Sequence, residues 1–246
     1  MSAWPDRVRR LILDEIDSTN AEAARQATLD PSPLWVMARR QSAGRGRQGR
    51  AWHAPEGNLM ASLLMPFEGG PGEAATTFAQ TAALAVHETC AAFAPMAEIR
   101  IKWPNDILVN RRKAAGILIE NLGPGPDGRL RIVTGIGLNL SHAPPAEETR
   151  WPATSLAAEG ATAPSPDDAL EILAQSFATW LARPAPQRQT AWRDRLHGIG
   201  DPMEARLPAE TLAGIFDGVD ETGALVLRTP HGVRHIPAAD VYFPEA

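Results

Sequence analysis

The segment from Gln41 to Trp52 constrains this 246-residue chain more than any other. Three glycines and three arginines alternate between Gly44 and Arg50, and a tryptophan follows closely. Glycine allows a tight backbone with positive φ, and arginine supplies a permanent charge with a planar set of donors for carboxylates and phosphates. This composition predicts a loop that captures an anion and closes over it. Taken alone, the segment also fits a solvated basic loop without a ligand.

The same loop contains the dinucleotide-binding pattern G-x-G-x-x-G. That pattern is meaningful only where a strand precedes the glycines and a helix begins at them. A strand is expected before the loop, at Leu34–Ala38. The residues after it include Pro55 and Gly57, have no helical apolar period, and lead to another strand-like run at Leu59–Met65. We therefore expect no nicotinamide or flavin site here.

A second polar motif, Lys102-Trp-Pro-Asn-Asp106, ends a short strand-like run and is followed at once by the apolar run Ile107–Val109. The next residues predict a hairpin whose turn spans Asn110 to Arg112. Lys113 lies at the exit of this turn, and the three small residues after it leave room for a ligand. For any single lysine, ordinary surface charge explains the sequence at least as well.

A third motif, Gly135-Ile-Gly-Leu-Asn139, ends the strand predicted at Leu130–Thr134. Glycines inside a strand mark close approach by a ligand or by another backbone, or a bulge. Near the N-terminus, a helix is expected to begin at Ser18 or Thr19, since Thr19 and Glu22 have the spacing of a capping box.

Together these motifs resemble, in order and in spacing, those of biotin protein ligases, which attach biotin to a lysine of a carrier protein. The matching segments are Asp17–Asn20, Gly44–Arg50, Lys102–Asp106, Lys113–Gly116 and Gly135–Asn139. The resemblance implies an α+β fold: a mixed β-sheet catalytic domain of the biotin/lipoate ligase and class II synthetase type, with a small C-terminal SH3-like β-barrel. We expect these domains to span residues 1–198 and 199–246. Because the first motif begins by residue 17, a short form without the N-terminal DNA-binding domain of some family members is expected.

The resemblance also implies a two-step reaction. The carboxylate of biotin attacks the α-phosphate of MgATP to give biotinyl-5′-AMP, and a lysine of a biotin carboxyl carrier protein then attacks this mixed anhydride. Cations must offset the repulsion between the two anions, and a carboxylate is needed to orient or deprotonate the lysine amine. The catalytic residues expected from the motifs are Arg47, Lys102, Lys113 and Asp106. No metal-binding residue is expected, because Mg²⁺ arrives with ATP.

Further site residues follow from the same motif positions. Those expected to bind biotin are Ser18, Thr19, Asn20, Gln41, Gly44, Arg45, Gly46, Arg47, Lys113, Gly116 and Gly135. Those expected to bind the nucleotide are Arg47, Arg50, Trp52, Lys102, Asn105, Lys113 and Asn139. Simpler roles remain open at this point: Ser18 and Thr19 could cap a helix, Trp52 could pack in the core, and Asp106 could stabilise a turn.

Composition favours a compact cytoplasmic enzyme. The net charge of −5 and the pI of about 5.7 argue against a nucleic-acid-binding protein that uses an Arg-Gly loop, although this alternative stays open. The single cysteine, Cys90, cannot form an internal disulfide and is expected to be buried and inert. We expect no membrane span, no nucleic-acid partner, and a monomer or homodimer. A lipoate protein ligase is the alternative within the same fold.

The remaining elements are predicted from apolar periodicity and from breakers. A leading strand is expected at 8–13 and strands of one sheet near 34, 59, 99, 107, 117 and 130. Helices are expected at 74–93, 167–181 and 187–196, the last two separated by Pro184 and Pro186. After a linker at 198–201, four short strands at 203–207, 211–217, 224–228 and 233–237 suggest the small barrel.

Overall fold

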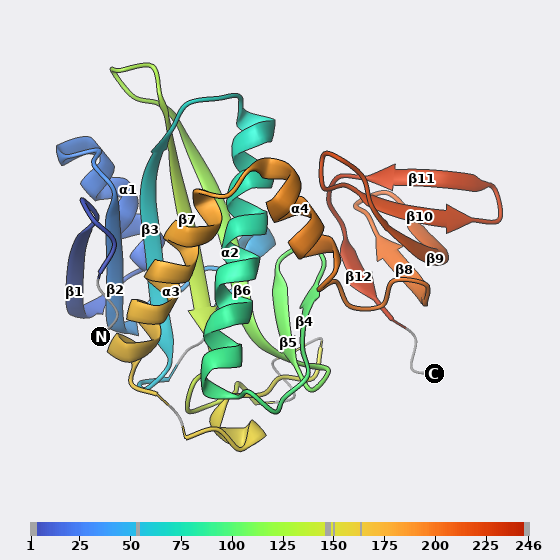
Figure 1. Ribbon diagram of the computed structural model, residues 1–246, viewed down its shortest axis with the longest axis horizontal. Coiled ribbons are helices and arrows are strands. Elements are labelled where there is room, and N and C mark those ends of the chain that lie inside the picture. The colour runs from blue at the N-terminus through green and yellow to red at the C-terminus, as the bar shows by residue number, and fades with distance from the viewer. Residues whose placement is uncertain (1–3, 53–54, 146–148, 150, 163, 244–246) are drawn as a thin grey trace.

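The computed structural model describes residues 4–52, 55–145, 149, 151–162 and 164–243. Two sheets organise these residues, one of seven strands and one of five. The larger sheet and its helices form the main body, and the smaller sheet projects from one side of it (Figure 1). No helix among the described residues has the length and apolar character required to cross a membrane.

The seven-stranded sheet has the order β1-β2-β3-β7-β6-β5-β4. Its strands are β1 (Arg9–Ile16), β2 (Leu34–Gln41), β3 (Leu59–Phe67), β4 (Ile99–Lys102), β5 (Asp106–Val109), β6 (Arg112–Pro124) and β7 (Leu130–Leu138). The first pair is parallel and every other pair is antiparallel, so the sheet is mixed, as predicted. The parallel pair needs a crossover, and helix α1 (Thr19–Leu29) provides it.

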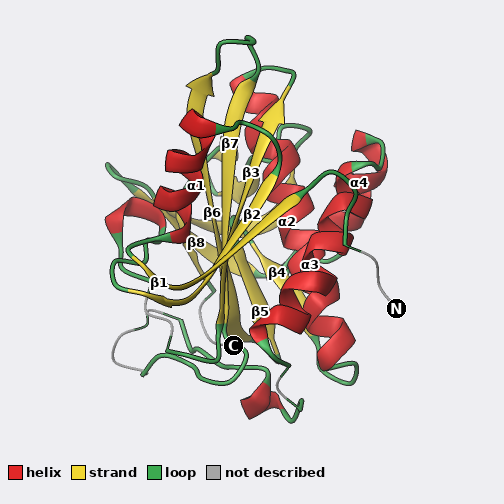
Figure 2. Cartoon of the chain, turned by 90° about the vertical axis from the view of Figure 1, so that its left-hand side faces the viewer, coloured by secondary structure: helices red, strands yellow, loops and turns green. Residues whose placement is uncertain are grey.

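Helices cover both faces of this sheet (Figure 2). On one side lies α1, while α2 (Pro71–Phe93) and α3 (Pro166–Leu181) pack together on the other, followed by α4 (Ala185–Arg193). The main hydrophobic core lies under α2 and α3, where the Trp35 and Phe177 rings meet edge to face at 5.8 Å. On the α1 side, the described residues form a small cluster of five buried apolar side chains, in which Ala23 of α1 packs with Leu34, Val36, Leu64 and Val133. The rest of the α1 face is therefore free for a ligand site.

The side chain of Cys90 lies on the buried face of the alanine-rich helix α2, as predicted. Cys90 is fully buried, and burial raises the pKa of its thiol to about 12, so the thiol stays protonated and unreactive. His87 lies one turn earlier, and its imidazole is also held neutral because burial lowers its pKa to about 4. Neither side chain lines the cavity described below.

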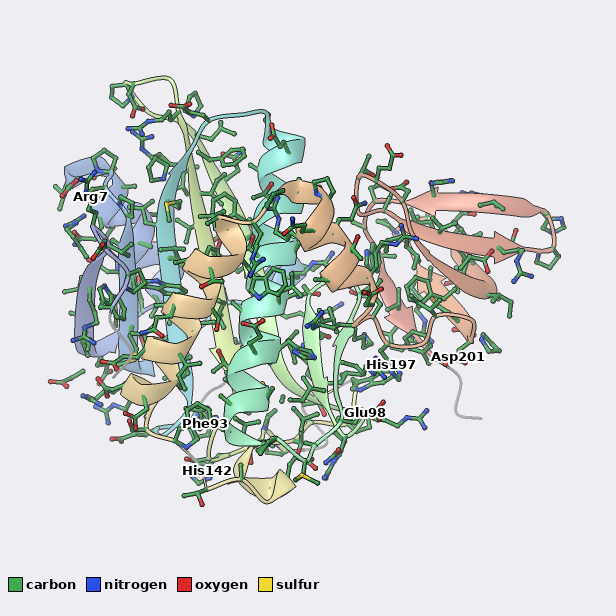
Figure 3. All side chains as sticks on the ribbon, in the orientation of Figure 1. Arg7, Phe93, Glu98, His142, His197 and Asp201 are labelled. Carbon is green, nitrogen blue, oxygen red and sulfur yellow. The ribbon has the colours of Figure 1, made fainter. Side chains whose placement is uncertain are left out.

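The five-stranded sheet has the order β11-β10-β9-β8-β12, and all of its pairs are antiparallel. Its strands are β8 (Pro202–Arg206), β9 (Thr211–Val219), β10 (Leu225–Thr229), β11 (Gly232–Ile236) and β12 (Asp240–Tyr242). This arrangement is consistent with an SH3-like module, but β11 and β12 do not pair, so the predicted barrel is not closed within the described residues. His197 and Asp201 mark the passage of the chain into this sheet (Figure 3).

Some predicted boundaries and contacts were wrong, each for a local reason. Ser18 caps α1, whereas Glu22 pairs with Arg25 and forms no capping box with Thr19. Helix α4 begins before its predicted start because prolines are tolerated in a first turn, where the N–H has no helical partner. The short strand β12 was missed altogether, since three residues leave no periodic signal.

Candidate active site

A cavity of about 620 Å³ lies on the α1 face of the large sheet. Its floor comes from β6 and β7, and its walls come from the start of α1, the Arg-Gly loop (residues 44–50), the β4–β5 connection and β12. Side chains alternate along β7, so Gly135, Gly137 and Asn139 face the same side of the sheet. All three line this cavity. Elements that are far apart in the sequence thus meet in one site.

One end of the cavity, beside β1 and β2, is rich in hydrogen-bonding groups. Gln41 Oε1 accepts from the Thr19 N–H at 2.7 Å and lies 3.0 Å from Thr19 Oγ1. Buried Ser62, on β3, lies 2.8 Å from that hydroxyl and donates to Asn20 Oδ1 at 2.6 Å. Ser18 caps the helix and also lines the cavity, so its role as a cap does not exclude a contact with a ligand. These donors and acceptors suit a small polar ring.

The Arg-Gly loop is a short hairpin with one helical turn, at Arg47–Gly49. The Gly46 N–H donates to Arg50 O at 2.7 Å, and the Trp52 N–H donates to Gly44 O at 2.9 Å. Gly44 was expected to bind biotin, but it does not line the cavity. It lies against the Trp52 carbonyl, which an added Cβ would overlap. The single turn at Arg47–Gly49 is not an α-helix, and the next element among the described residues is β3, so the dinucleotide-binding pattern lacks its required context.

The opposite end of the cavity is cationic. Lys113 Nζ lies 2.6 Å from Asp106 Oδ1, an ion pair without hydrogen-bond alignment, and Lys102 Nζ lies 3.8 Å from Asp106 Oδ2. Burial lowers the pKa of Lys102, and the charge of Lys113 adds to this while Asp106 opposes it. Arg47 completes the group, and burial lowers its pKa too, although a guanidinium remains charged. Lys102 and Lys113 are the only lysines in the sequence.

Two asparagines connect this cationic end to the sheet. Asn105 Oδ1 accepts from Arg47 Nη1 at 3.1 Å, and its Nδ2 donates to Ile117 O at 2.8 Å. Asn139 donates through Nδ2 to Thr154 O at 3.0 Å, whereas its Oδ1 is buried without a hydrogen-bond partner among the described residues. A buried amide oxygen without a partner is costly, so this atom is a candidate acceptor for a ligand.

Trp52 lies on a floor made by a pair of glycines. Gly116 of β6 and Gly137 of β7 are directly paired, and an added Cβ at Gly116 would lie 2.9 Å from Trp52 Cζ3. An added Cβ at Gly137 would overlap the indole. Trp52 Nε1 is buried without a hydrogen-bond partner in the part of the chain that the structure describes, and Lys113 Nζ lies 5.6 Å from the ring centre. Trp52 therefore packs against backbone within the cavity.

The C-terminal module completes the wall through Asp240, Val241 and Tyr242 of β12. Asp240 forms an ion pair with Arg50 of the Arg-Gly loop. A second contact between the modules runs from Trp103 Nε1 to Gly223 O at 3.0 Å. The small sheet is thus bonded both to the loop and to the β4–β5 connection.

The cavity brings together every predicted site residue except Gly44. Sequence reasoning missed Gly137, which strand alternation from Gly135 would have identified. It also missed Trp151 and the β12 residues, which no local pattern connects to the motifs. The Trp151 ring centre lies 4.9 Å from Lys102 Nζ.

Comparison with known proteins agrees with this geometry. The profile of the biotin/lipoate A/B protein ligase family matches residues 12–139, and that of the biotin protein ligase C terminal domain matches residues 198–243. The chain belongs to this ligase family. A biotin--[acetyl-CoA-carboxylase] ligase of Paracoccus denitrificans is 43% identical over 94% of this chain and 99% of that protein. One from Mycobacterium tuberculosis is 31% identical over 94% of this chain and 87% of its own length.

Among solved structures, a biotin protein ligase from Aquifex aeolicus, in complex with biotin and ATP, covers 96% of this chain and 99% of its own. The TM-score is 0.77 at 22% identity, so this likeness concerns the fold. The biotin protein ligase from Leishmania major in complex with biotinyl-5-AMP has a TM-score of 0.65 at 22% identity. Both likenesses concern the two-sheet architecture alone.

Proposed function

We propose that this chain is a biotin protein ligase, which joins biotin to a lysine of a biotin carboxyl carrier protein through biotinyl-5′-AMP, with MgATP as cosubstrate. One observation carries the proposal beyond family membership. A single cavity holds a polar hydrogen-bonding end beside β1 and β2 and a cationic end on β4 to β6. A substrate with a polar ring, an apolar tail and a carboxylate fits between these ends.

In the first step, the carboxylate of biotin attacks the α-phosphate and pyrophosphate leaves. Both reactants are anionic, so their approach requires positive charge that is already in place. Arg47 and Lys113 hold the carboxylate and the α-phosphate together, and Lys102 adds charge near the leaving phosphates. Lys102 is nearly buried, with 8% of its side chain exposed, so little water screens its charge.

At the other end, Ser18, Thr19 and Gln41 hydrogen-bond the ureido ring of biotin, whose N–H and C=O groups require both acceptors and donors. Lipoate carries a dithiolane ring, which offers no comparable partners. This difference favours biotin over lipoate for a polar pocket of this kind. Asn139 Oδ1, which is buried without a partner among the described residues, accepts from the nucleotide, and Trp52 stacks on the adenine.

The intermediate is a mixed anhydride, which water would hydrolyse. We propose that the Arg-Gly loop closes over it and excludes water. In the second step the amine of the carrier lysine must lose a proton, and Asp106 is the candidate to orient or accept it. Asp106 is paired with both lysines in this structure, so Lys113 must first turn toward the phosphate.

The wider setting is part of the same proposal. The catalytic domain spans residues 1–198 and the C-terminal module residues 199–246, and the enzyme acts in the cytoplasm as a monomer or homodimer without a nucleic-acid partner. The charge distribution supports the last point. Arg45 and Arg50 of the loop pair with Glu120 and Asp240, so their charge is partly neutralised rather than presented to a polyanion.

The decisive experiment is ATP–pyrophosphate exchange with the full chain, run in parallel with biotin and with lipoate. Exchange that depends on biotin, followed by transfer to a carrier domain but not to its Lys→Arg variant, is the expected result. Exchange that depends on lipoate would assign the chain to the lipoate branch of the family. Absence of exchange with both acids, together with salt-sensitive binding of DNA or RNA, would replace the enzyme by a nucleic-acid-binding protein.

A further inference from the structure

Glu120, on β6, is a carboxylate outside the cavity lining that bonds to two parts of the site at once. Its Oε2 accepts from Asn20 Nδ2 at 2.6 Å, and Arg45 Nη2 of the Arg-Gly loop donates to the same oxygen at 3.2 Å. Asn20 is buried at 4% exposure. One carboxylate oxygen therefore joins a buried side chain of α1 to the Arg-Gly loop, although Glu120 lies 100 residues from Asn20 and 75 residues from Arg45 in the sequence.

The bond to Asn20 fixes the orientation of that amide. An ionised carboxylate can only accept, so Asn20 must turn its NH₂ group toward Glu120 and its oxygen toward Ser62. Ser62 Oγ donates to Asn20 Oδ1 at 2.6 Å and lies 2.8 Å from Thr19 Oγ1, which is 3.0 Å from Gln41 Oε1. The polar end of the cavity is thus continuous with Glu120.

We propose that Glu120 is a positioning residue: it holds Arg45, and with it the Arg-Gly loop, against the network that contacts the polar ring of the substrate. This proposal rests on the proposed function. It adds a residue that connects the polar end of the cavity, where the ring of biotin binds, to the closure of the Arg-Gly loop. Glu120 does not touch the reacting atoms. It acts through Arg45 on one side and through Asn20 on the other.

The burial of the three partners shows why this pair differs from an ordinary surface ion pair. The Glu120 side chain is 31% exposed and that of Arg45 is 49% exposed, so water screens the charge–charge attraction. The Asn20 amide, in contrast, is packed against the backbone of β7, since an added Cβ at Gly135 would overlap its Oδ1. This contact limits the movement of Asn20 if the carboxylate is displaced. The Asn20 bond therefore fixes Glu120, and a fixed carboxylate costs Arg45 less entropy to bind.

The test uses the full chain and the variants Glu120→Gln, Glu120→Asp, Arg45→Gln and the Glu120→Gln/Arg45→Gln double variant. Glutamine keeps an oxygen for Asn20 but removes the charge that holds Arg45. Glu15→Gln is the matched control, because Glu15 of β1 pairs with Arg40 of β2 at 2.6 Å, and both side chains are exposed and outside the cavity lining. The readouts are the KM for biotin and kcat from pyrophosphate release, and the rate of trypsin cleavage after Arg47 and Arg50, the sites in residues 44–50 that every variant retains.

For Glu120→Gln we expect the KM for biotin to rise about fivefold while kcat changes less than about twofold, the scale of a partly exposed ion pair. Trypsin cleavage within 44–50 should accelerate about fivefold in the absence of any ligand, again from the loss of that pair. The double variant should match Arg45→Gln alone, and Glu120→Asp should recover part of the effect.

Wild-type KM and cleavage rates in Glu120→Gln would overturn the inference, and so would effects of the single variants that multiply in the double variant. An equal effect in Glu15→Gln would also overturn it. The cleavage readout needs no substrate, so it tests Glu120 even if the wild type lacks biotin-dependent activity. A wild type without biotin-dependent activity would reject the proposed function. The cleavage rates alone would then decide whether Glu120 holds the loop.

Discussion

Substitution of Lys113 by alanine tests the cationic end of the cavity most directly. Arg47, Lys102 and Lys113 surround one carboxylate, Asp106, so the cluster has a formal surplus of two positive charges. Lys113→Ala halves that surplus where two anions must meet. Removal of one preorganised donor costs about 2.7–4 kcal/mol in the transition state. The Lys113 side chain is 27% exposed, so we expect the lower end, a fall in adenylate formation of about a hundredfold.

The assay is biotin-dependent pyrophosphate release at saturating ATP, with kcat and KM determined separately. Lys113→Arg should retain much of the activity because it keeps the charge, although it cannot reproduce the ammonium geometry. Arg129→Ala removes an exposed arginine that pairs with Asp127 and should leave the rate unchanged. The thermal midpoint should shift little, since Lys102 remains near Asp106. Near-normal release by Lys113→Ala, or a loss that merely follows the thermal midpoint, would refute the reasoning.

Three further substitutions test separate parts of the structure. Arg47→Gly should favour the open loop and shorten the lifetime of bound adenylate by roughly 10- to 100-fold, because a charge-assisted hydrogen bond is lost. The released adenylate should then label bystander proteins. An unchanged release rate in stopped-flow measurements would contradict this. Gly137→Ala should displace Trp52 and shift the tryptophan fluorescence. It should also lower adenylate formation at least about tenfold, because a misplaced contact near the reacting groups is costly. The added Cβ of Gly116→Ala has more space, so equal effects in that variant would argue against the overlap. His87→Leu should flatten the pH dependence of stability. The pKa of His87 is about 4 in the folded protein against an ordinary value of 6.5, so the unfolded chain binds the proton first as pH falls. In the wild type, this lowers the free energy of unfolding by roughly 2 kcal/mol between pH 7 and 4.5. Urea denaturation at both pH values measures this, and parallel curves for wild type and variant would contradict it.

The local patterns of the sequence predicted most of the large sheet and the composition of the cavity. Glycines at 116 and 135 imply close approach, and the structure has Trp52 against the first and Asn20 against the second. The Arg-Gly loop and the two lysines also lie where their motifs place them, because short-range turns and strand ends determine their positions.

Other features depend on contacts between distant segments, which no local pattern encodes. Asp240 reaches Arg50 only because the small sheet packs against the β4–β5 connection. Glu120 belongs to a strand whose exposed face has no distinctive period, so its bonds to Asn20 and Arg45 follow from the fold alone. The ion pairs of Asp106 are similar: its motif indicated a turn or a catalytic carboxylate, but not a side chain shared by two lysines.

The confinement of both lysines to the cavity has a chemical consequence for the enzyme itself. The other 22 of its 24 basic residues are arginines, and guanidinium groups are poor nucleophiles toward acyl anhydrides at neutral pH. Activated biotin that leaves the cavity therefore meets a protein surface almost without reactive side-chain amines, since Lys102 is 8% and Lys113 27% exposed. Self-acylation of side chains is limited by composition, and lysines modified by amine-selective reagents would report on the interior of one cavity.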